Sequence, residues 1–309
     1  MKGKDFITVA ELSTEQIESI FELALKLKSN PDDYEDALTN MTMAMIFEKP
    51  SLRTRVSFEA GMTQMGGHAM YLGPSDISLG KRESVPDIAR VLDRMVDIIM
   101  ARTFAHDSVT TLAEYASIPV INGLSDLHHP CQAIADYLTI LEKKGTLKGL
   151  KLAFVGDGNN VAHSLLECGA KTGVSVTIVC PKGYEPKKEI FDAAFEEGKK
   201  MGATMAVCND WKEGVKGADV VYTDVWASMG QEKEAEERKK IFLPYQVNSE
   251  LMALADKEAI FMHCLPAHRG EEVTDEVIES WQSVVFDEAE NRLHAQKSLI
   301  LKLLLGEIE

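Results

Sequence analysis

The feature that most constrains the fold is a regular alternation of short apolar runs with longer segments of helical periodicity. The alternation forms two series, which are separated by the polar segment 144–149 (KGTLKG). Parallel strands need crossover connections, which are usually helices that cover the sheet on both faces. The sequence therefore predicts an α/β protein of two doubly wound domains with central parallel sheets, whose ligands bind at the carboxyl ends of the strands.

The periodicity also predicts the bounds of most elements. The first helix is capped by Ser13, which forms a capping box with Gln16, and it ends near residues 29–31. The first series then has strands at 41–47, 68–72, 97–103 and 119–122 and helices at 53–65, 84–95 and 109–117. The second series has strands at 151–155, 174–180, 204–208, 218–224, 259–264 and 283–286 and helices at 161–172, 187–201 and 248–256.

Two helices are expected to join the domains. The first domain covers residues 1–130 and is completed by the C-terminal segment 290–309, because the apolar helix 293–305 has no strand of its own. A helix at 131–144 and the polar link form the connection 131–149, and the second domain covers 150–289. Each domain is long enough to bury its own core.

Composition excludes several classes of function. A formal net charge of −16 argues against nucleic acid or an anionic membrane as a partner. No apolar run approaches the roughly 20 residues of a membrane helix, and the polar N-terminus does not read as a signal peptide. The five cysteines lack metal-ligand spacing, so we expect a reduced cytoplasmic protein with no metal site.

The segment 47–55 (FEKPSLRTR) joins a predicted strand to a predicted helix. Ser51 occupies the N-cap position, and the free backbone N–H groups of the first turn can bind a phosphate. Residues two apart on a helix point about 200° from each other, so we assign Arg53 to the phosphate and pair Arg55 with Glu59. The same spacing also fits a plain cap with surface arginines.

Other polar residues follow predicted strands or precede predicted helices. Arg102 ends one strand, where it could bind an anion or form a salt bridge, and His129 precedes a helix, where it could be a simple cap. Asp224 opens the segment 224–230 (DVWASMG), which could be only a capped loop. Cys264 lies in the segment 263–266 (HCLP) at another strand end.

The segment 156–161 (GDGNNV) begins like a dinucleotide-binding fingerprint. Val161 replaces its third glycine, and the next strand ends in Cys180 and Pro181 rather than in an acid for a ribose hydroxyl. The sequence therefore argues against a dinucleotide. Asn160 instead offers an amide at the edge of the sheet.

These segments together resemble the aspartate/ornithine carbamoyltransferase family. Ser51-x-Arg53-Thr54-Arg55 resembles its phosphate-binding signature, and His129-Pro-x-Gln132 resembles its carbamoyl-binding motif. The segments 224–230 and 263–266 are similar to the ornithine-using branch and not to the aspartate-using one. The resemblance spans the chain from Ser51 to Arg292.

The resemblance implies a role for each matched residue. Those implied to bind carbamoyl phosphate are Ser51, Leu52, Arg53, Thr54, Arg102, His129, Pro130, Cys131, Gln132, Cys264, Leu265 and Arg292. Those implied to bind ornithine are Asn160, Asp224, Ser228 and Met229, and those implied to be catalytic are Arg102, His129, Gln132 and Cys264. Ser78 departs from the family, which usually has a glutamine there that helps to bind carbamoyl phosphate.

The implied reaction is carbamoyl transfer from carbamoyl phosphate to L-ornithine, giving L-citrulline and phosphate in arginine metabolism. The leaving group is already activated, so we expect no metal or organic cofactor. The family also implies a homotrimer or a multiple of trimers. Two alternatives remain at this point: another acceptor amine such as putrescine, and a non-catalytic protein that binds phosphorylated metabolites.

Overall fold

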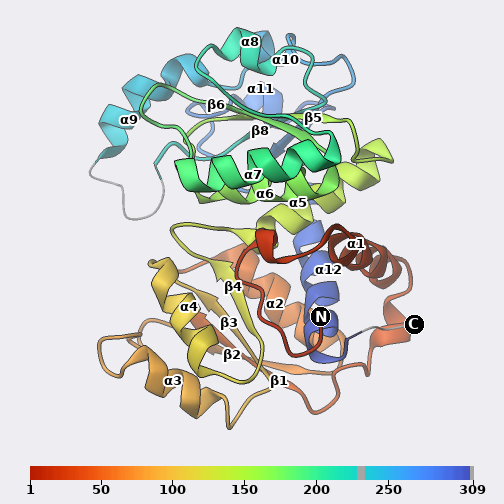
Figure 1. The fold of residues 1–309 in the computed structure, drawn as a ribbon, viewed down its shortest axis with the longest axis vertical. Coiled ribbons are helices and arrows are strands. Elements are labelled where there is room, and N and C mark those ends of the chain that lie inside the picture. Colours follow the sequence, from red (N-terminus) through yellow and green to blue (C-terminus); the bar gives the residue numbers. More distant parts are fainter. Residues whose placement is uncertain (228–233, 307–309) are drawn as a thin grey trace. The chain divides into compact units, whose positions relative to one another are not determined.

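The computed structural model describes residues 1–227 and 234–306 of the chain. The chain divides into two compact units: unit 1 comprises Met1–Leu138 and Glu290–Glu309, and unit 2 comprises Thr139–Ala289. The chain enters unit 2 within helix α5 (Pro130–Lys144) and returns to unit 1 within helix α12 (Val285–Leu304). Each unit has a parallel sheet with helices on both faces, so the predicted α/β fold class is confirmed (Figure 1).

Unit 1 contains a four-stranded parallel sheet in the order β2-β1-β3-β4. Its strands are β1 (Thr42–Phe47), β2 (His68–Leu72), β3 (Ile98–Arg102) and β4 (Val120–Leu124). The central strands are buried along nearly their whole length, as expected for a parallel sheet that is covered on both sides. All four strands were predicted from their apolar runs.

The helices of unit 1 cover both faces of this sheet (Figure 1). They are α1 (Thr14–Ser29), α2 (Leu52–Gln64), α3 (Val85–Leu92), α4 (His106–Tyr115) and the unit 1 parts of α5 and α12, with the short 3-10 helices Val9–Glu11 and Pro31–Tyr34. Ile88 of α3 and Val109 of α4 pack with Ile46 and Ile99 in the core of one face. The predicted capping box of Ser13 and Gln16 opens α1.

Unit 2 contains a five-stranded parallel sheet in the order β7-β6-β5-β8-β9. Its strands are β5 (Lys151–Val155), β6 (Ser175–Val179), β7 (Met205–Cys208), β8 (Val220–Thr223) and β9 (Ile260–His263). Its helices are α6 (Asn160–Thr172), α7 (Lys188–Met201), α8 (Trp211–Val215), α9 (Ala235–Phe242), α10 (Ser249–Met252) and α11 (Asp275–Ile278), with the 3-10 helix Leu243–Tyr245. Val215, Leu251 and Val277 pack on one face of this sheet.

The predicted strand at 283–286 is wrong. Contact with β9 is limited to an isolated bridge between Ser283 and Phe261, and helix α12 already begins at Val285. A short apolar run fits a strand or a buried helix equally well, and the acidic residues Asp287 and Glu288 favour a helix start here. The predicted helix 248–256 is also shorter than expected, because α10 covers only four residues.

The charged run 231–240 lies partly outside the described residues, since the description resumes at Glu234. Glu234 and Arg238, four residues apart in the sequence, form an ion pair at 3.2 Å. Arg238 is nevertheless buried and also contacts Asp157 at 2.7 Å, so this part of the run is not simply a solvated face. No helix within the described ranges is long and apolar enough to cross a membrane.

Candidate functional site

The N-terminus of α2 forms the centre of the candidate site in unit 1. Ser51 is its N-cap, and its hydroxyl accepts a hydrogen bond from the Thr54 N–H at 3.3 Å. Arg55 points away, because it pairs with Glu59 at 3.0 Å and lies over the ring of Tyr71 at 4.1 Å. The predicted cap and the predicted structural pair are therefore confirmed, and the first turn of α2 presents N–H groups at the positive end of a helix dipole.

The register of the sheet brings Arg102 to the same edge as this turn. Phe47 at the end of β1 pairs with Arg102 at the end of β3, and the Glu48 N–H donates to the Arg102 carbonyl at 2.9 Å. The chain continues from β1 directly into α2, so the buried Arg102 side chain lies at the sheet edge that carries Ser51. Parallel strands place all their carboxyl ends at one edge, which explains the grouping.

Arg292 connects three elements of unit 1. Its guanidinium donates to Gln132 Oε1 at 2.6 Å and to Thr54 Oγ1 at 3.3 Å. Gln132 in turn donates to the buried carboxylate of Asp136 at 2.8 Å. The three residues that the resemblance assigned to one ligand, Thr54, Gln132 and Arg292, are thus brought together by direct hydrogen bonds.

His129 is buried beside these cations. Its pKa is held well below the usual value, first by burial and then by the positive charges of Arg292, Arg102, Lys49 and Arg53. The imidazole is therefore neutral at physiological pH and can still donate one N–H hydrogen bond. Arg53 contributes the smallest of these charge effects on His129.

Lys49 was not among the predicted site residues. Its side chain is only 8% exposed, and its ammonium lies 4.8 Å from the centre of the Phe104 ring. Burial, followed by the charge of Arg102, lowers its pKa to about 8. Its position beside the first turn of α2 was visible in the sequence, but its burial among like charges was not.

Three other residues were predicted to bind carbamoyl phosphate, but their side chains are not part of this cationic group. Leu52 is 74% exposed, so its side chain contributes little to a pocket and only its backbone N–H faces the helix end. The buried Cys131 thiol donates to the Asn122 carbonyl at 3.4 Å, and burial raises its pKa to about 12. Pro130 opens α5, where its missing N–H costs nothing.

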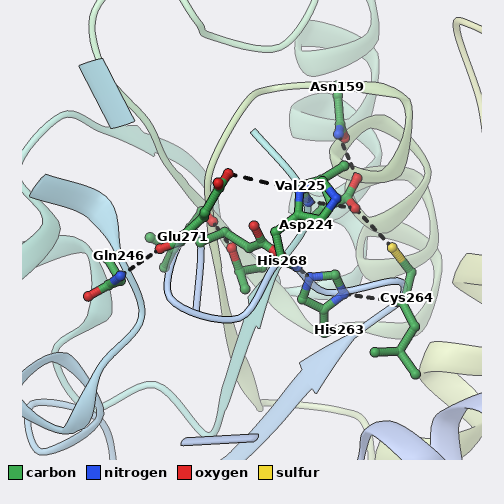
Figure 2. A network of polar contacts seen from close by, with 12 residues as sticks. Asn159, Asp224, Val225, Gln246, His263, Cys264, His268 and Glu271 are labelled. Atoms are coloured by element: carbon green, nitrogen blue, oxygen red, sulfur yellow. Dashed lines mark hydrogen bonds and ion pairs between the residues drawn. The ribbon is translucent and has the colours of Figure 1, made fainter. Parts of the chain in front are cut away.

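Unit 2 carries a second group of polar residues at the carboxyl edge of its sheet (Figure 2). Asp224 follows β8 directly and is buried. Its carboxylate accepts hydrogen bonds from the Cys264 thiol at 3.1 Å, from the Val225 N–H at 2.8 Å and from the Asn159 amide at 2.8 Å. The structure thus brings together Asp224, which the resemblance assigned to ornithine, and Cys264, which it assigned to catalysis and carbamoyl phosphate binding.

The loop after β9 is held by a buried histidine. His263 contacts Glu272 through Nε2 at 3.1 Å, and its Nδ1 accepts from the Leu265 N–H at 2.8 Å. The His263 backbone N–H donates to Glu288 at 2.9 Å. Leu265 has a φ of 54°, in the left-handed region, and its peptide bond to Pro266 is cis. Cys264 is therefore part of a backbone held on both sides.

The turn after β5 explains the glycine pattern that resembled a dinucleotide site. Gly158 donates its N–H to the Tyr184 carbonyl at 2.8 Å, and a Cβ at this position would lie 2.3 Å from the Pro186 nitrogen. This glycine is needed because the segment 184–186 packs against it. Asn159, not Asn160, is the N-cap of α6 and the partner of Asp224, a role that no sequence pattern predicted.

One group of side chains here has the composition of a metal site. Ligand atoms of Asp224, His263 and Cys264 all lie within 4.8 Å of one another. Both ring nitrogens of His263 already take part in hydrogen bonds, so a metal ion would have to displace either Glu272 or the Leu265 N–H. The predicted ornithine residues Ser228 and Met229 lie outside the described residues.

The fold and the two groups define a class of protein: an α/β protein with a helix N-terminus among cationic side chains in one unit and a carboxylate–thiol pair in the other. Family models agree with this division. The aspartate/ornithine carbamoyltransferase carbamoyl-P binding domain matches residues 4–142, and the Asp/Orn binding domain of the same family matches residues 148–303. The chain belongs to the aspartate/ornithine carbamoyltransferase family.

Individual relatives match the chain over nearly its whole length. An ornithine carbamoyltransferase of Halalkalibacterium halodurans is 54% identical, covering 99% of this chain and 97% of the relative. An anabolic ornithine carbamoyltransferase of Pyrococcus furiosus is 53% identical, covering 100% and 98%. A solved structure of the ornithine carbamoyltransferase from Pyrococcus furiosus superimposes with a TM-score of 0.96 at 54% identity, covering 100% and 99% of the two chains.

Proposed function

We propose that this protein transfers the carbamoyl group of carbamoyl phosphate to the side-chain amine of L-ornithine, giving L-citrulline and phosphate. The observation that carries the proposal is the Asp224–Cys264 pair, an acidic group at a sheet edge in a chain that belongs to the carbamoyltransferase family. Relatives named ornithine carbamoyltransferase, more than half identical over nearly the whole chain, support the same reaction.

Unit 1 is proposed to bind carbamoyl phosphate. The N–H groups of the first turn of α2, with Ser51, Arg53 and Thr54, suit the phosphate, since a helix N-terminus favours an anion. Arg102 and neutral His129 are proposed to donate to the carbonyl oxygen, where negative charge develops in the transition state. Gln132 and Arg292, which are already hydrogen-bonded to each other, are proposed to hold the carbamoyl group.

Pro130 and Cys131 are proposed to take part in carbamoyl phosphate binding through their backbone, because the Cys131 thiol is engaged with Asn122. Leu52 is likewise proposed to contribute only its N–H group. The Cys264 and Leu265 carbonyls of unit 2 are proposed to accept from the carbamoyl NH2.

Unit 2 is proposed to bind ornithine. Asp224 suits the α-amino group because its carboxylate is already arranged to accept N–H and S–H donors. Cys264 is proposed to contact the side-chain amine, and Asn160 to contact the amino-acid end. Ser228 and Met229 complete this proposal on the basis of the sequence motif alone. An acceptor that carries a second amine suits acidic residues, whereas aspartate would call for arginines.

The chemical step needs no cofactor. The neutral amine attacks the carbamoyl carbon, a C–N bond forms, the C–O bond to phosphate breaks, and the amine loses a proton. The phosphate leaves with its electron pair at the end of α2. Catalysis is then positioning and electrostatic stabilisation, which the cationic group of unit 1 can supply.

Further proposals concern the domain bounds, the metabolic role, the cellular location and the oligomeric state. The domain bounds 1–130 with 290–309, 131–149 and 150–289 are proposed as functional divisions. We propose a role in arginine biosynthesis, in keeping with the anabolic relative, and a cytoplasmic location. We also propose a homotrimer or a multiple of trimers, on the resemblance to the family alone.

The test is direct. Purified protein is incubated with carbamoyl phosphate and ornithine, and citrulline and phosphate are measured. We expect equal amounts of both products. Putrescine and aspartate, offered as alternative acceptors, should react far more slowly; faster reaction with putrescine would change the assigned acceptor. Phosphate release that does not depend on any amine would contradict a transferase.

A further inference from the structure

Asn159 uses both ends of its side-chain amide. Its Oδ1 accepts hydrogen bonds from the Val161 N–H at 2.9 Å and the Ala162 N–H at 3.2 Å, which caps helix α6. Its Nδ2 donates to Asp224 Oδ2 at 2.8 Å (Figure 2). An ordinary N-cap needs only an acceptor, so the second bond is additional to the capping role.

We propose that Asn159 is a positioning residue for ornithine, which acts by fixing the carboxylate of Asp224 and, through it, the thiol of Cys264. The inference rests on the proposed function for its link to ornithine. The link from Asn159 to Asp224 and Cys264 rests on the geometry alone.

The two oxygens of Asp224 have different partners. Oδ1 accepts from the Val225 N–H and the Cys264 thiol, whereas Oδ2 accepts from Asn159. The terminal torsion of an aspartate is broad, so bonds to one oxygen alone leave the plane of the carboxylate poorly defined. The hydrogen bond from Asn159 to the second oxygen fixes the plane of the Asp224 carboxylate. Because the same carboxylate holds Cys264, a turn of the carboxylate would also release the thiol.

The charges around Asp224 explain why a neutral donor suits this position. Asp157 lies close enough for the charge of Asp224 to raise its pKa, although burial is the larger cause. Arg238 already neutralises Asp157 at 2.7 Å and also donates to the Trp226 carbonyl at 3.0 Å. An amide orients Asp224 without cancelling its charge, so the carboxylate stays available for an ammonium group.

Substitutions can separate capping from positioning. Asn159→Ser keeps a capping acceptor but removes the donor to Asp224, and Asn159→Asp keeps the cap but sets a third carboxylate beside Asp224 and Asp157. Asn248→Ser is the matched control, because Asn248 caps α10 through the Leu251 N–H at 3.0 Å.

We expect Asn159→Ser to raise the KM for ornithine at least tenfold and Asn159→Asp to raise it further, with the KM for carbamoyl phosphate changed less than twofold. Asn248→Ser should match the wild type. A residue that only caps α6 would give the opposite result: both Asn159 variants would keep the wild-type KM for ornithine, and the proposal would be wrong.

A second measurement does not depend on the proposed function. Alkylation of Cys264 by iodoacetamide, without substrates, is followed by the mass of its peptide, with the half-buried Cys208 as internal reference. A thiol that donates to a carboxylate is held in its unreactive protonated form, so Asn159→Ser should alkylate at Cys264 at least threefold faster.

The two measurements separate the possible failures. Equal Cys264 rates in Asn159→Ser and the wild type would overturn the positioning role, whatever the reaction is. A faster Cys264 rate in a protein that makes no citrulline would support the positioning role and contradict the proposed function.

Discussion

Anion binding in unit 1 should weaken as the pH rises through 8, because Lys49 loses its charge in that range. Burial and the neighbouring Arg102 lower the pKa of Lys49 from about 10.5 to about 8. A depressed lysine pKa means that the ammonium is charged below pH 8 and neutral above it. The anion prefers the charged form, so affinity is expected at neutral pH and lost at alkaline pH.

The size of the effect follows from the charged fraction of Lys49. A group with a pKa of 8 is about 90% charged at pH 7 and about 10% charged at pH 9, which predicts a loss of affinity of about ninefold, or ~1.3 kcal/mol. Neighbouring groups do not titrate in this window: His129 is already neutral, and the pKa of Cys131 is about 12. A phosphate ester has a second pKa of about 6, so it stays mainly a dianion from pH 7 to pH 9.

Calorimetry with methyl phosphate, a phosphate monoester, at pH 7, 8 and 9 measures this loss directly, and the KM for carbamoyl phosphate provides a second measure. Lys49→Met should bind methyl phosphate weakly at pH 7 and show no further loss at pH 9. Lys26→Met, at an exposed position on α1, controls for the loss of one positive charge. A constant affinity in the wild type, or a ninefold loss that persists in Lys49→Met, would refute the role of Lys49.

Three other outcomes are expected. Arg102→Leu should lower the rate of citrulline formation on the order of 10² or more, the usual weight of one oxyanion donor, and near-normal turnover would remove Arg102 from the site. The rate at limiting ornithine should rise between roughly pH 6 and 9, since an alkylammonium of pKa about 10.4 must lose a proton to attack, and a flat profile would contradict this step. Arg238→Met should lower the free energy of unfolding in urea by about 3 kcal/mol, because it leaves Asp157 buried without its partner; an unchanged midpoint would argue against this bridge.

The strands could be predicted because a sheet covered on both faces buries nearly every residue of a strand. Nine of the ten predicted strands correspond to β1 through β9 for this reason. The tenth, 283–286, failed because Val285 enters the core of unit 2 from the start of a helix and not from a strand. Burial alone does not distinguish a strand from the first turn of a buried helix.

The site was predictable where one local rule decides the geometry. Ser51 caps α2 because a hydroxyl precedes a helical pattern, and this could be read directly from the sequence. Between Asn159 and Asn160 no local rule decides, since either could cap α6, and only the backbone of the β5–α6 turn makes Asn159 the cap. The buried state of Lys49 depends on the ends of β1 and β3 lying side by side, which no local pattern encodes.

Arg238 is a further example of a residue whose surroundings cannot be predicted from local sequence patterns. Its pair with Glu234 four residues earlier was predictable and is present, but a pair between neighbouring turns of a helix fits an exposed face. Its more buried partner is Asp157, which is 81 residues distant in the sequence. Local spacing therefore predicts the exposed partner of Arg238, which is Glu234, but not the more buried partner, which is Asp157.

The charges at the two sheet edges are sorted by sign, and this sorting bears on specificity. The edge in unit 1 gathers Lys49, Arg102 and Arg292, with His129 kept neutral by burial and then by these charges. The edge in unit 2 gathers Asp224 and Asp157, with one of the two already neutralised by Arg238. A group of cations beside a neutral histidine has its charge available for an anion. A carboxylate oriented by a neutral amide likewise keeps its charge for a cation. One anionic and one cationic substrate therefore fit these edges better than two substrates of the same sign, which favours a cationic acceptor such as ornithine over aspartate.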